Sequence, residues 1–474
     1  MNGPASDSLQ TSTGTLRLLA GQALSRAAGA PLVGGNRVRL LVDGGDHFDA
    51  WAAMIGAARR YVLVENYIIS DDAVGRRIRD LLVERARAGV QVALIHDWFG
   101  TLGQAGHAFF APLREAGVAV RVFNPLRLDS PLGWVGRDHR KLVVADGAAA
   151  SISGVCIARR WLGDPARGIP PWRDTGVLIE GPAVADVEAS FRDSWNALGE
   201  PLAFPPGPVP EAQGSIALRV IATEPAHGPI YRLDSLVAAM ATRTLWLSDA
   251  YFVGVPTYVS GLAAAAADGV DVRLLVPGSS DVPAVAALSR MGYRPLLEAG
   301  IRVFEWNGSM MHAKTAVADS RWARVGSSNL NLSSWLANRE LDVAIEDSAF
   351  AESLEDQYLR DLGNATELVL AGRRARPRPL AARHAVRRRG GSSSRAAAGA
   401  LRLANTVGAV ITNRRVLGDA ERGTLSLAGF VLVLLALLGA WIPQLLAWPI
   451  ALAAAWIGLS LLWKRFRRPR PPPP

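Results

Sequence analysis

Cysteine is almost absent from this chain of 474 residues. The one cysteine, Cys156, cannot form an intramolecular disulfide, and a cysteine-ligated zinc or iron–sulfur site would need several such residues. Neither disulfides nor metal sites of this kind can therefore hold the fold, and the hydrophobic residues, 50% of the chain, must supply its core. The length suits two domain-sized units.

Acidic residues outnumber basic ones in most of the chain. The net charge is +10, but residues 373–474 hold 18 Lys plus Arg and only two acids, a local charge of +16 that leaves −6 on residues 1–372. A body with this charge disfavours a nucleic-acid groove, and the surface that seeks polyanions is expected in the C-terminal part.

Charged residues are missing altogether from residues 423–463. These 41 residues contain no Asp, Glu, Lys, Arg or His, whereas ~20 residues cross a bilayer once. A break at Trp441-Ile442-Pro443-Gln444 favours a transmembrane hairpin of two spans, and the basic residues at both of its ends would place the body in the cytoplasm. The alternative is a buried helical hairpin of a soluble domain.

Three further segments flank the main units. Residues 369–422 form an Arg-rich juxtamembrane segment, which either attracts anionic lipid headgroups or is a solvated linker that helps to set the topology. Residues 464–474 form a basic, proline-rich tail. Residues 1–35 form an N-terminal extension in which we find no cleavable signal peptide.

The chain repeats itself over residues 36–200 and 215–368. Both segments contain the same order of apolar runs and helix-like stretches, and Tyr67 and Tyr251 end matching runs. Five prolines mark residues 201–214 as a linker. Alternating strands and helices predict α/β units with a largely parallel or mixed sheet, and two similar halves predict a pseudo-twofold particle with a shared interface.

The halves share one polar constellation most closely. It consists of a histidine, a lysine two positions later and an aspartate five positions after the lysine: His139, Lys141 and Asp146, then His312, Lys314 and Asp319. Because alternate side chains of a strand share a face, imidazole and ammonium would project together.

Lysine usage supports a special role for these positions. The chain has three Lys against 49 Arg, and two of the three occupy equivalent places in the repeated motif. A chain so rich in arginine would use Arg wherever any cation serves, so these two sites need the compact ammonium of lysine. A phosphate pocket beside a nucleophile is a site of this kind.

Both motifs resemble the H-x-K-x4-D signature of the phospholipase D superfamily, and the likeness covers nearly all of residues 36–368. The nearer resemblance is to bacterial cardiolipin synthases. It implies two similar α/β/α sandwich halves related by a pseudo-twofold axis, to which the C-terminal transmembrane hairpin is added. It also implies a bacterial cytoplasmic-membrane enzyme that needs neither a metal nor another cofactor.

The resemblance further implies two displacements at phosphorus through a phosphohistidine. It makes His139 the nucleophile and His312 the acid/base, and the sequence allows the reverse assignment. Candidates for binding the phosphate are Lys141, Lys314, Asn329 and Ser327.

Acidic residues complete the predicted site. Glu340 and Asp174 follow their motif histidines by 28 and 35 residues and are candidates for orienting a catalytic imidazole. Asp146 and Asp319 belong to the catalytic signature, and we expect them to brace a turn rather than to react. Cys156 stands where the family has asparagine, and a thiol is a weaker hydrogen-bonding partner.

The leading hypothesis is a membrane-anchored phosphatidyltransferase that makes cardiolipin. Its substrates would be two phosphatidylglycerols, or phosphatidylglycerol and another phospholipid such as phosphatidylethanolamine. A phospholipase D that hydrolyses phospholipids would have the same active site. A nuclease or other phosphodiesterase is disfavoured by the acidic body, and a non-catalytic membrane scaffold by the intact motifs. The sequence does not indicate an oligomeric state.

Overall fold

The computed structural model describes residues 19–125 and 136–370, the backbone of 414–416 and scattered positions between 430 and 459. Most of the predicted Arg-rich segment and of the predicted hairpin, and all of the tail 464–474, lie outside the described residues. No helix among those described is both long and apolar enough to cross a bilayer.

The first half alternates strands and helices as the sequence predicts. Its elements, in chain order, are β1 (Val33–Val42), α2 (Asp43–Ala57), β2 (Tyr61–Asn66), α3 (Ala73–Arg87), β3 (Gln91–Asp97), α4 (Trp98–Thr101), α5 (His107–Glu115), β4 (Ala119–Phe123), β5 (Lys141–Ala145), β6 (Ala149–Ser153), the 3-10 turns Arg159–Trp161 and Pro165–Arg167, β7 (Thr175–Glu180) and α6 (Val184–Ala197).

The second half follows the same plan. Its elements are β8 (Ile216–Thr223), α7 (Pro229–Met240), β9 (Thr244–Ser248), α8 (Pro256–Ala267), β10 (Asp271–Pro277), α9 (Pro283–Met291), α10 (Tyr293–Glu298), β11 (Arg302–Trp306), β12 (Thr315–Ala318), β13 (Trp322–Gly326), α11 (Leu332–Leu336), β14 (Glu340–Glu346), α12 (Ser348–Leu362) and β15 (Ala365–Val369). The short strand β16 (Arg414–Val416) pairs with β15 in parallel.

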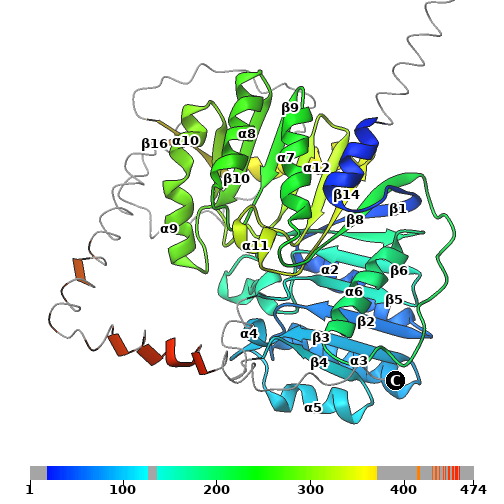
Figure 1. Cartoon of the computed structure of the whole chain (residues 1–474). Coiled ribbons are helices and arrows are strands. Elements are labelled where there is room, and N and C mark those ends of the chain that lie inside the picture. Colours follow the sequence, from blue (N-terminus) through cyan, green and yellow to red (C-terminus); the bar gives the residue numbers. More distant parts are fainter. Residues whose placement is uncertain are drawn as a thin grey trace, which may run out of the picture.

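The strands form one mixed sheet in which the halves have the same strand order. The first half reads β1-β7-β6-β5-β2-β3-β4 and the second β8-β14-β13-β12-β9-β10-β11, and β1 joins them by pairing with β8. In each half three strands run parallel and the others antiparallel. The predicted α/β class is confirmed, and the matching order is what a duplicated unit produces. Figure 1 shows the second half above the first.

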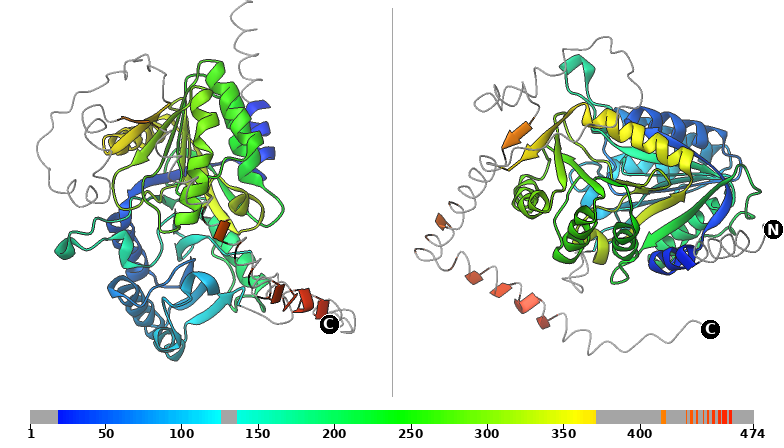
Figure 2. Two further views of the ribbon diagram at one scale, coloured as in Figure 1. Left: turned by 90° about the vertical axis from the view of Figure 1, so that its left-hand side faces the viewer. Right: turned by 90° about the horizontal axis from the view of Figure 1, so that it is seen from above.

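Three apolar clusters hold the layers together. The largest joins the halves, because it contains strands of both together with α6 and α12, whose Phe191 and Tyr358 are buried. A second cluster lies under α2, α3 and α5, and a third under α7, α8 and α10. Helices therefore cover both faces of the sheet, as Figure 2 shows for α7 and α12. Strands buried on both faces require apolar runs such as Tyr61–Asn66.

The described part of the N-terminal extension packs on the second half. Residues 19–28 are helical, and Leu24 and Ala28 lie in the apolar cluster under α7 and α8. The Arg219 guanidinium donates to the Gly21 carbonyl at 3.1 Å and to the Ser25 hydroxyl at 3.2 Å. Since β1 begins at Val33, the end of the predicted extension already belongs to the sheet.

The two motif aspartates lie at the turns after β5 and β12. Both residues are left-handed, with φ of 56° at Asp146 and 54° at Asp319. The Asp146 carboxylate accepts three consecutive backbone N–H groups ahead of β2, at 2.8, 2.7 and 2.9 Å. Asp319 accepts three ahead of β9, at 2.8, 2.7 and 2.9 Å. Each aspartate therefore ties its turn to the start of the neighbouring strand.

We expect Asp146→Ala to lower the free energy of unfolding by about 2–3 kcal/mol, because three backbone donors lose a charged acceptor. Urea unfolding of the variant measures this change. Asp80→Ala on the exposed side of α3 is the matched control, with an expected change within about 0.5 kcal/mol. Equal stability of the two variants would contradict the bracing role.

Candidate active site

The twin motifs meet because short backbone segments of one half pair with segments of the other half. Asp138, the residue before His139, forms a parallel β-bridge with Arg339 of the second half. The His139 N–H donates to the Arg339 carbonyl at 2.9 Å. In the same way, Arg173 of the first half bridges to Met311, and the His312 N–H donates to the Arg173 carbonyl at 2.7 Å. Each histidine therefore lies beside the segment that carries the acid of the opposite half.

Each of the two predicted orienting acids contacts the histidine of the opposite half. His139 Nδ1 lies 2.8 Å from Glu340 Oε2, and His312 Nδ1 lies 2.7 Å from Asp174 Oδ2. Both carboxylates are fully buried. Each acid thus contacts the imidazole of the other half and not that of the motif it follows in sequence. With Nδ1 bound to a carboxylate, Nε2 is the nitrogen left for chemistry.

Further donors fix the two carboxylates. The Ser327 hydroxyl donates to Glu340 at 2.6 Å, and the Trp161 indole donates to Asp174 at 2.9 Å. Gly154 occupies the place that Ser327 has in the other half, and a Cβ there would lie 2.4 Å from Asp174 Oδ1. The buried hydroxyl of Ser327 is engaged with Glu340, so the structure shows an orienting contact for this residue, and its binding of phosphate stays a prediction.

The motif lysines lie directly beneath the histidines. Lys141 Nζ donates to the His139 carbonyl and Lys314 Nζ to the His312 carbonyl, and both lysines are buried. Lys314 Nζ also lies 3.0 Å from His312 Nδ1. Burial lowers the pKa of both ammonium groups, to about 8 for Lys314. The site therefore contains two compact cations in a region shielded from water.

Two tyrosines enclose the imidazoles in equivalent positions. The Tyr67 ring lies edge-on to His139 at 4.9 Å, and the Tyr251 ring edge-on to His312 at 5.9 Å. Each ring also faces the lysine of its own half, at 5.1 Å from Lys141 and 5.8 Å from Lys314. Neither tyrosine belongs to the catalytic signature, and their matching places in the repeat are the signal in the sequence that marks them.

Burial and the nearby lysines keep both imidazoles neutral in the free protein. Burial lowers the pKa of His139, an effect that Glu340 opposes and Lys141 adds to. Burial and then Lys314 lower the pKa of His312 to about 4. Burial alone would raise the pKa of Asp174, but His312 and Lys314 outweigh it and lower the pKa to about 2. The orienting acids are thus ionised, and the histidines take up a proton only when an anion joins them.

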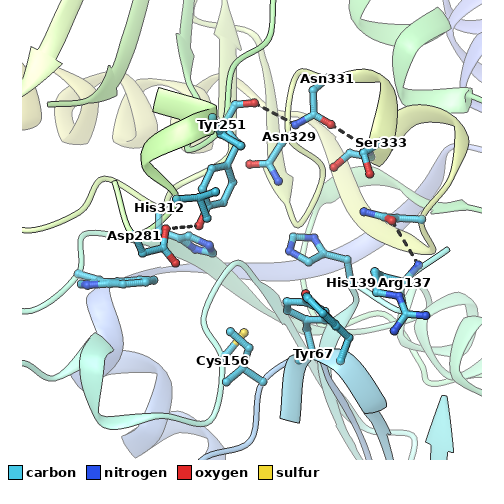
Figure 3. A pocket seen from close by; sticks show the side chains of 18 of the residues that line it. Tyr67, Arg137, His139, Cys156, Tyr251, Asp281, His312, Asn329, Asn331 and Ser333 are labelled. Atoms are coloured by element: carbon cyan, nitrogen blue, oxygen red, sulfur yellow. Dashed lines mark hydrogen bonds between the residues drawn. The ribbon is translucent and has the colours of Figure 1, made fainter. Parts of the chain in front are cut away.

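The histidines open into a cavity of about 750 Å³ between the halves. Figure 3 shows His139 and His312 next to each other within it. Asn329 and Cys156, which hold equivalent positions in the two motifs, both line the cavity. Asn329 Oδ1 is buried and has no hydrogen-bonding partner among the described residues. Burial raises the pKa of the Cys156 thiol, which is therefore a neutral, weakly polar group.

Known proteins resemble this chain in sequence. Residues 237–362 match the family model described as "Cardiolipin synthase, PLD-like domain". Cardiolipin synthase A of Pseudomonas aeruginosa PAO1 is 33% identical over 367 residues, which cover 75% of this chain and 72% of the relative. The cardiolipin synthase A of Pseudomonas entomophila is 32% identical and covers 73% of each chain.

A solved structure has the same fold. Phosphatidylserine synthase of Haemophilus influenzae superposes with a TM-score of 0.54 at 13% identity, covering 73% of this chain and 91% of that one. Because the Pseudomonas relatives exceed 30% identity over most of their length, this chain belongs to the cardiolipin synthase family of the phospholipase D superfamily.

Proposed function

We propose that this protein is a phosphatidyltransferase that makes cardiolipin. It would join two phosphatidylglycerols, or phosphatidylglycerol and phosphatidylethanolamine, and release the small headgroup alcohol. The observation that carries the proposal is the pair of imidazoles in one cavity, each held at Nδ1 by a buried carboxylate of the opposite half. Such a pair suits double displacement at phosphorus, which needs a nucleophile and a proton donor together.

In the first step His139 Nε2 attacks the phosphodiester phosphorus, and the bond from phosphorus to the headgroup oxygen breaks. His312, as imidazolium, gives its Nε2 proton to that oxygen, and the headgroup alcohol leaves. In the second step neutral His312 takes the proton of an incoming lipid hydroxyl, whose oxygen attacks phosphorus. The P–N bond breaks, and both histidines return to their starting states.

The negative charge of the phosphate favours uptake of the missing proton from solvent. A bound phosphodiester is an anion, so it raises the pKa of the imidazoles that Lys141 and Lys314 hold down. Lys141 and Lys314 are held before the substrate arrives by their hydrogen bonds to the carbonyls of His139 and His312, and Asn329 lines the same cavity, where its amide N–H can donate to a phosphoryl oxygen. Preorganised cations and an amide N–H can stabilise charge on the phosphoryl oxygens without reorganisation.

Apolar side chains at the cavity favour a lipid over a nucleic acid. Phe99, Leu102, Val282 and Leu332, here called the apolar rim, line the cavity from both halves. Their exposed fractions are 50%, 55%, 40% and 56%. Acyl chains would bury this surface, whereas a polynucleotide would leave it in contact with phosphates. We propose further that the uncharged run 423–463 anchors the body at a bacterial cytoplasmic membrane.

The direct test is product analysis with labelled phosphatidylglycerol in mixed micelles, with and without phosphatidylethanolamine. We expect labelled cardiolipin, and a decrease of at least about 10³-fold in His139→Ala and His312→Ala. His107→Ala, an exposed histidine on α5, is the matched control with unchanged turnover. Phosphatidic acid as the sole product would make the protein a hydrolase, and no lipid turnover by the folded wild type would contradict the proposal.

Binding of a phosphate mimic tests the charge of the histidines. At pH 7 we expect tungstate binding to take up a fraction of a proton, because the anion raises imidazole pKa values that are low in the free protein. Affinity should therefore rise as the pH falls. Calorimetry in two buffers of different ionisation enthalpy measures the uptake, and His312→Asn should reduce it. Binding without proton uptake would mean that an imidazole is already charged.

The apolar rim has its own test. Phe99→Ser with Leu102→Ser should lower turnover on vesicles by about 10-fold, because apolar area that would enter the lipid is lost. Turnover of a short-chain phosphatidylglycerol below its micellar concentration should not change. Val209→Ser with Met240→Ser removes exposed apolar side chains away from the cavity and is the control. An equal loss on both substrates would show that the rim does not act through lipid.

A further inference from the structure

One carboxylate faces the cavity on the side of His312. Asp281 lies in the loop between β10 and α9, and among the described residues that line the cavity it is the one that carries a carboxyl group. The Tyr251 hydroxyl donates to Asp281 Oδ1 at 2.7 Å. Since the Tyr251 ring packs edge-on against His312, the tyrosine links this carboxylate to the acid/base histidine. Figure 3 shows Asp281 beside His312.

The described residues of the first half, 36–125 and 136–200, have no such arrangement. Tyr67 is the equivalent of Tyr251, yet no described side chain hydrogen-bonds its hydroxyl. Arg137 lines the cavity on the side of His139, where its guanidinium lies 3.2 Å from buried Asp97. Figure 3 shows Arg137 on the far side of His139 from Asp281. The two halves repeat the reacting groups, but they differ in what lies beside them.

The free oxygen of Asp281 is an acceptor without a donor. Oδ1 is engaged by Tyr251, and Oδ2 accepts no hydrogen bond from the described residues. Arg160 also lines the cavity, but its guanidinium lies 5.1 Å over the Trp172 ring and forms no ion pair with Asp281. An exposed carboxylate of this kind accepts bonds from hydroxyl or ammonium groups and repels phosphate and carboxylate.

We propose that Asp281 and Tyr251 form the subsite for the headgroup alcohol, and that the subsite selects headgroups that carry hydroxyl or ammonium donors. The proposal rests on the proposed function. The leaving oxygen must come within hydrogen-bonding reach of His312 to receive its proton, which places the rest of the headgroup on the Asp281 side. The incoming alcohol gives its proton to the same histidine, so it occupies the same subsite.

The test compares three phosphatidyl donors whose headgroups are glycerol, ethanolamine and butanol. Butanol offers no donor beyond the reacting oxygen, so it reports the chemical step alone. With Asp281→Ala we expect kcat/KM to fall about 10- to 100-fold for the glycerol and ethanolamine donors and to stay within about 2-fold for the butanol donor. Asp281→Asn should keep more activity on glycerol than on ethanolamine, because the amide oxygen still accepts a bond but attracts no cation.

Two further variants separate the subsite from a structural effect. Tyr251→Phe keeps the ring against His312 and removes the hydroxyl that positions Asp281, so it should show the same headgroup pattern more weakly. Asp268→Asn, an exposed acid after α8, should leave all three donors unchanged. Equal losses on the three donors, or no loss, would overturn the subsite while the proposed function stands. A wild type that turns over none of them would overturn both.

Discussion

The site depends on two hydrogen bonds between the halves, each of which joins a carboxylate of one half to a histidine of the other. Glu340 can orient His139, and Asp174 can orient His312, only while the two halves are docked. A buried carboxylate without its imidazole would lose a hydrogen-bond donor, which is costly in a region that excludes water. Docking of the two halves therefore also fixes the tautomer of both histidines, with the proton on Nδ1 and Nε2 left for chemistry.

The rest of the fold maintains that docking. Strand β1 pairs with β7 and with β8, so one sheet runs through both halves. The largest apolar cluster fills the space between α6, α12 and the strands of both halves, and it lies behind the reacting groups. Asp146 and Asp319 fix the turns at the ends of the two motif strands. The buried lysines and the histidines and tyrosines that line the cavity are consequently held in place before a substrate binds, as preorganised catalysis requires.

The sequence predicted what is local or repeated, and it missed what depends on contacts between the halves. The repeat and the twin motifs led to His139 and His312, and the family resemblance led to both orienting acids. Their crosswise pairing was not predictable, because spacing along the chain says nothing about which half an acid will face. The contact of Ser327 with Glu340, which lies within the second half, and the place of Asp281 in the cavity were missed because spacing along the chain does not show which side chains of separate elements meet. Each arises where loops of different halves or elements meet.

Burst kinetics with a phosphatidyl-p-nitrophenol donor would test most directly whether each acid serves the histidine of the opposite half. This leaving group needs no proton, so the first step depends on His139 and not on His312. We predict that Glu340→Gln lowers the rate of the p-nitrophenol burst by about 10²-fold, whereas Asp174→Asn leaves it nearly unchanged and slows the later transfer to an alcohol. The reverse pattern, with the burst lost in Asp174→Asn and kept in Glu340→Gln, would contradict the joint assignment of His139 as the nucleophile and of Glu340 as its orienting acid.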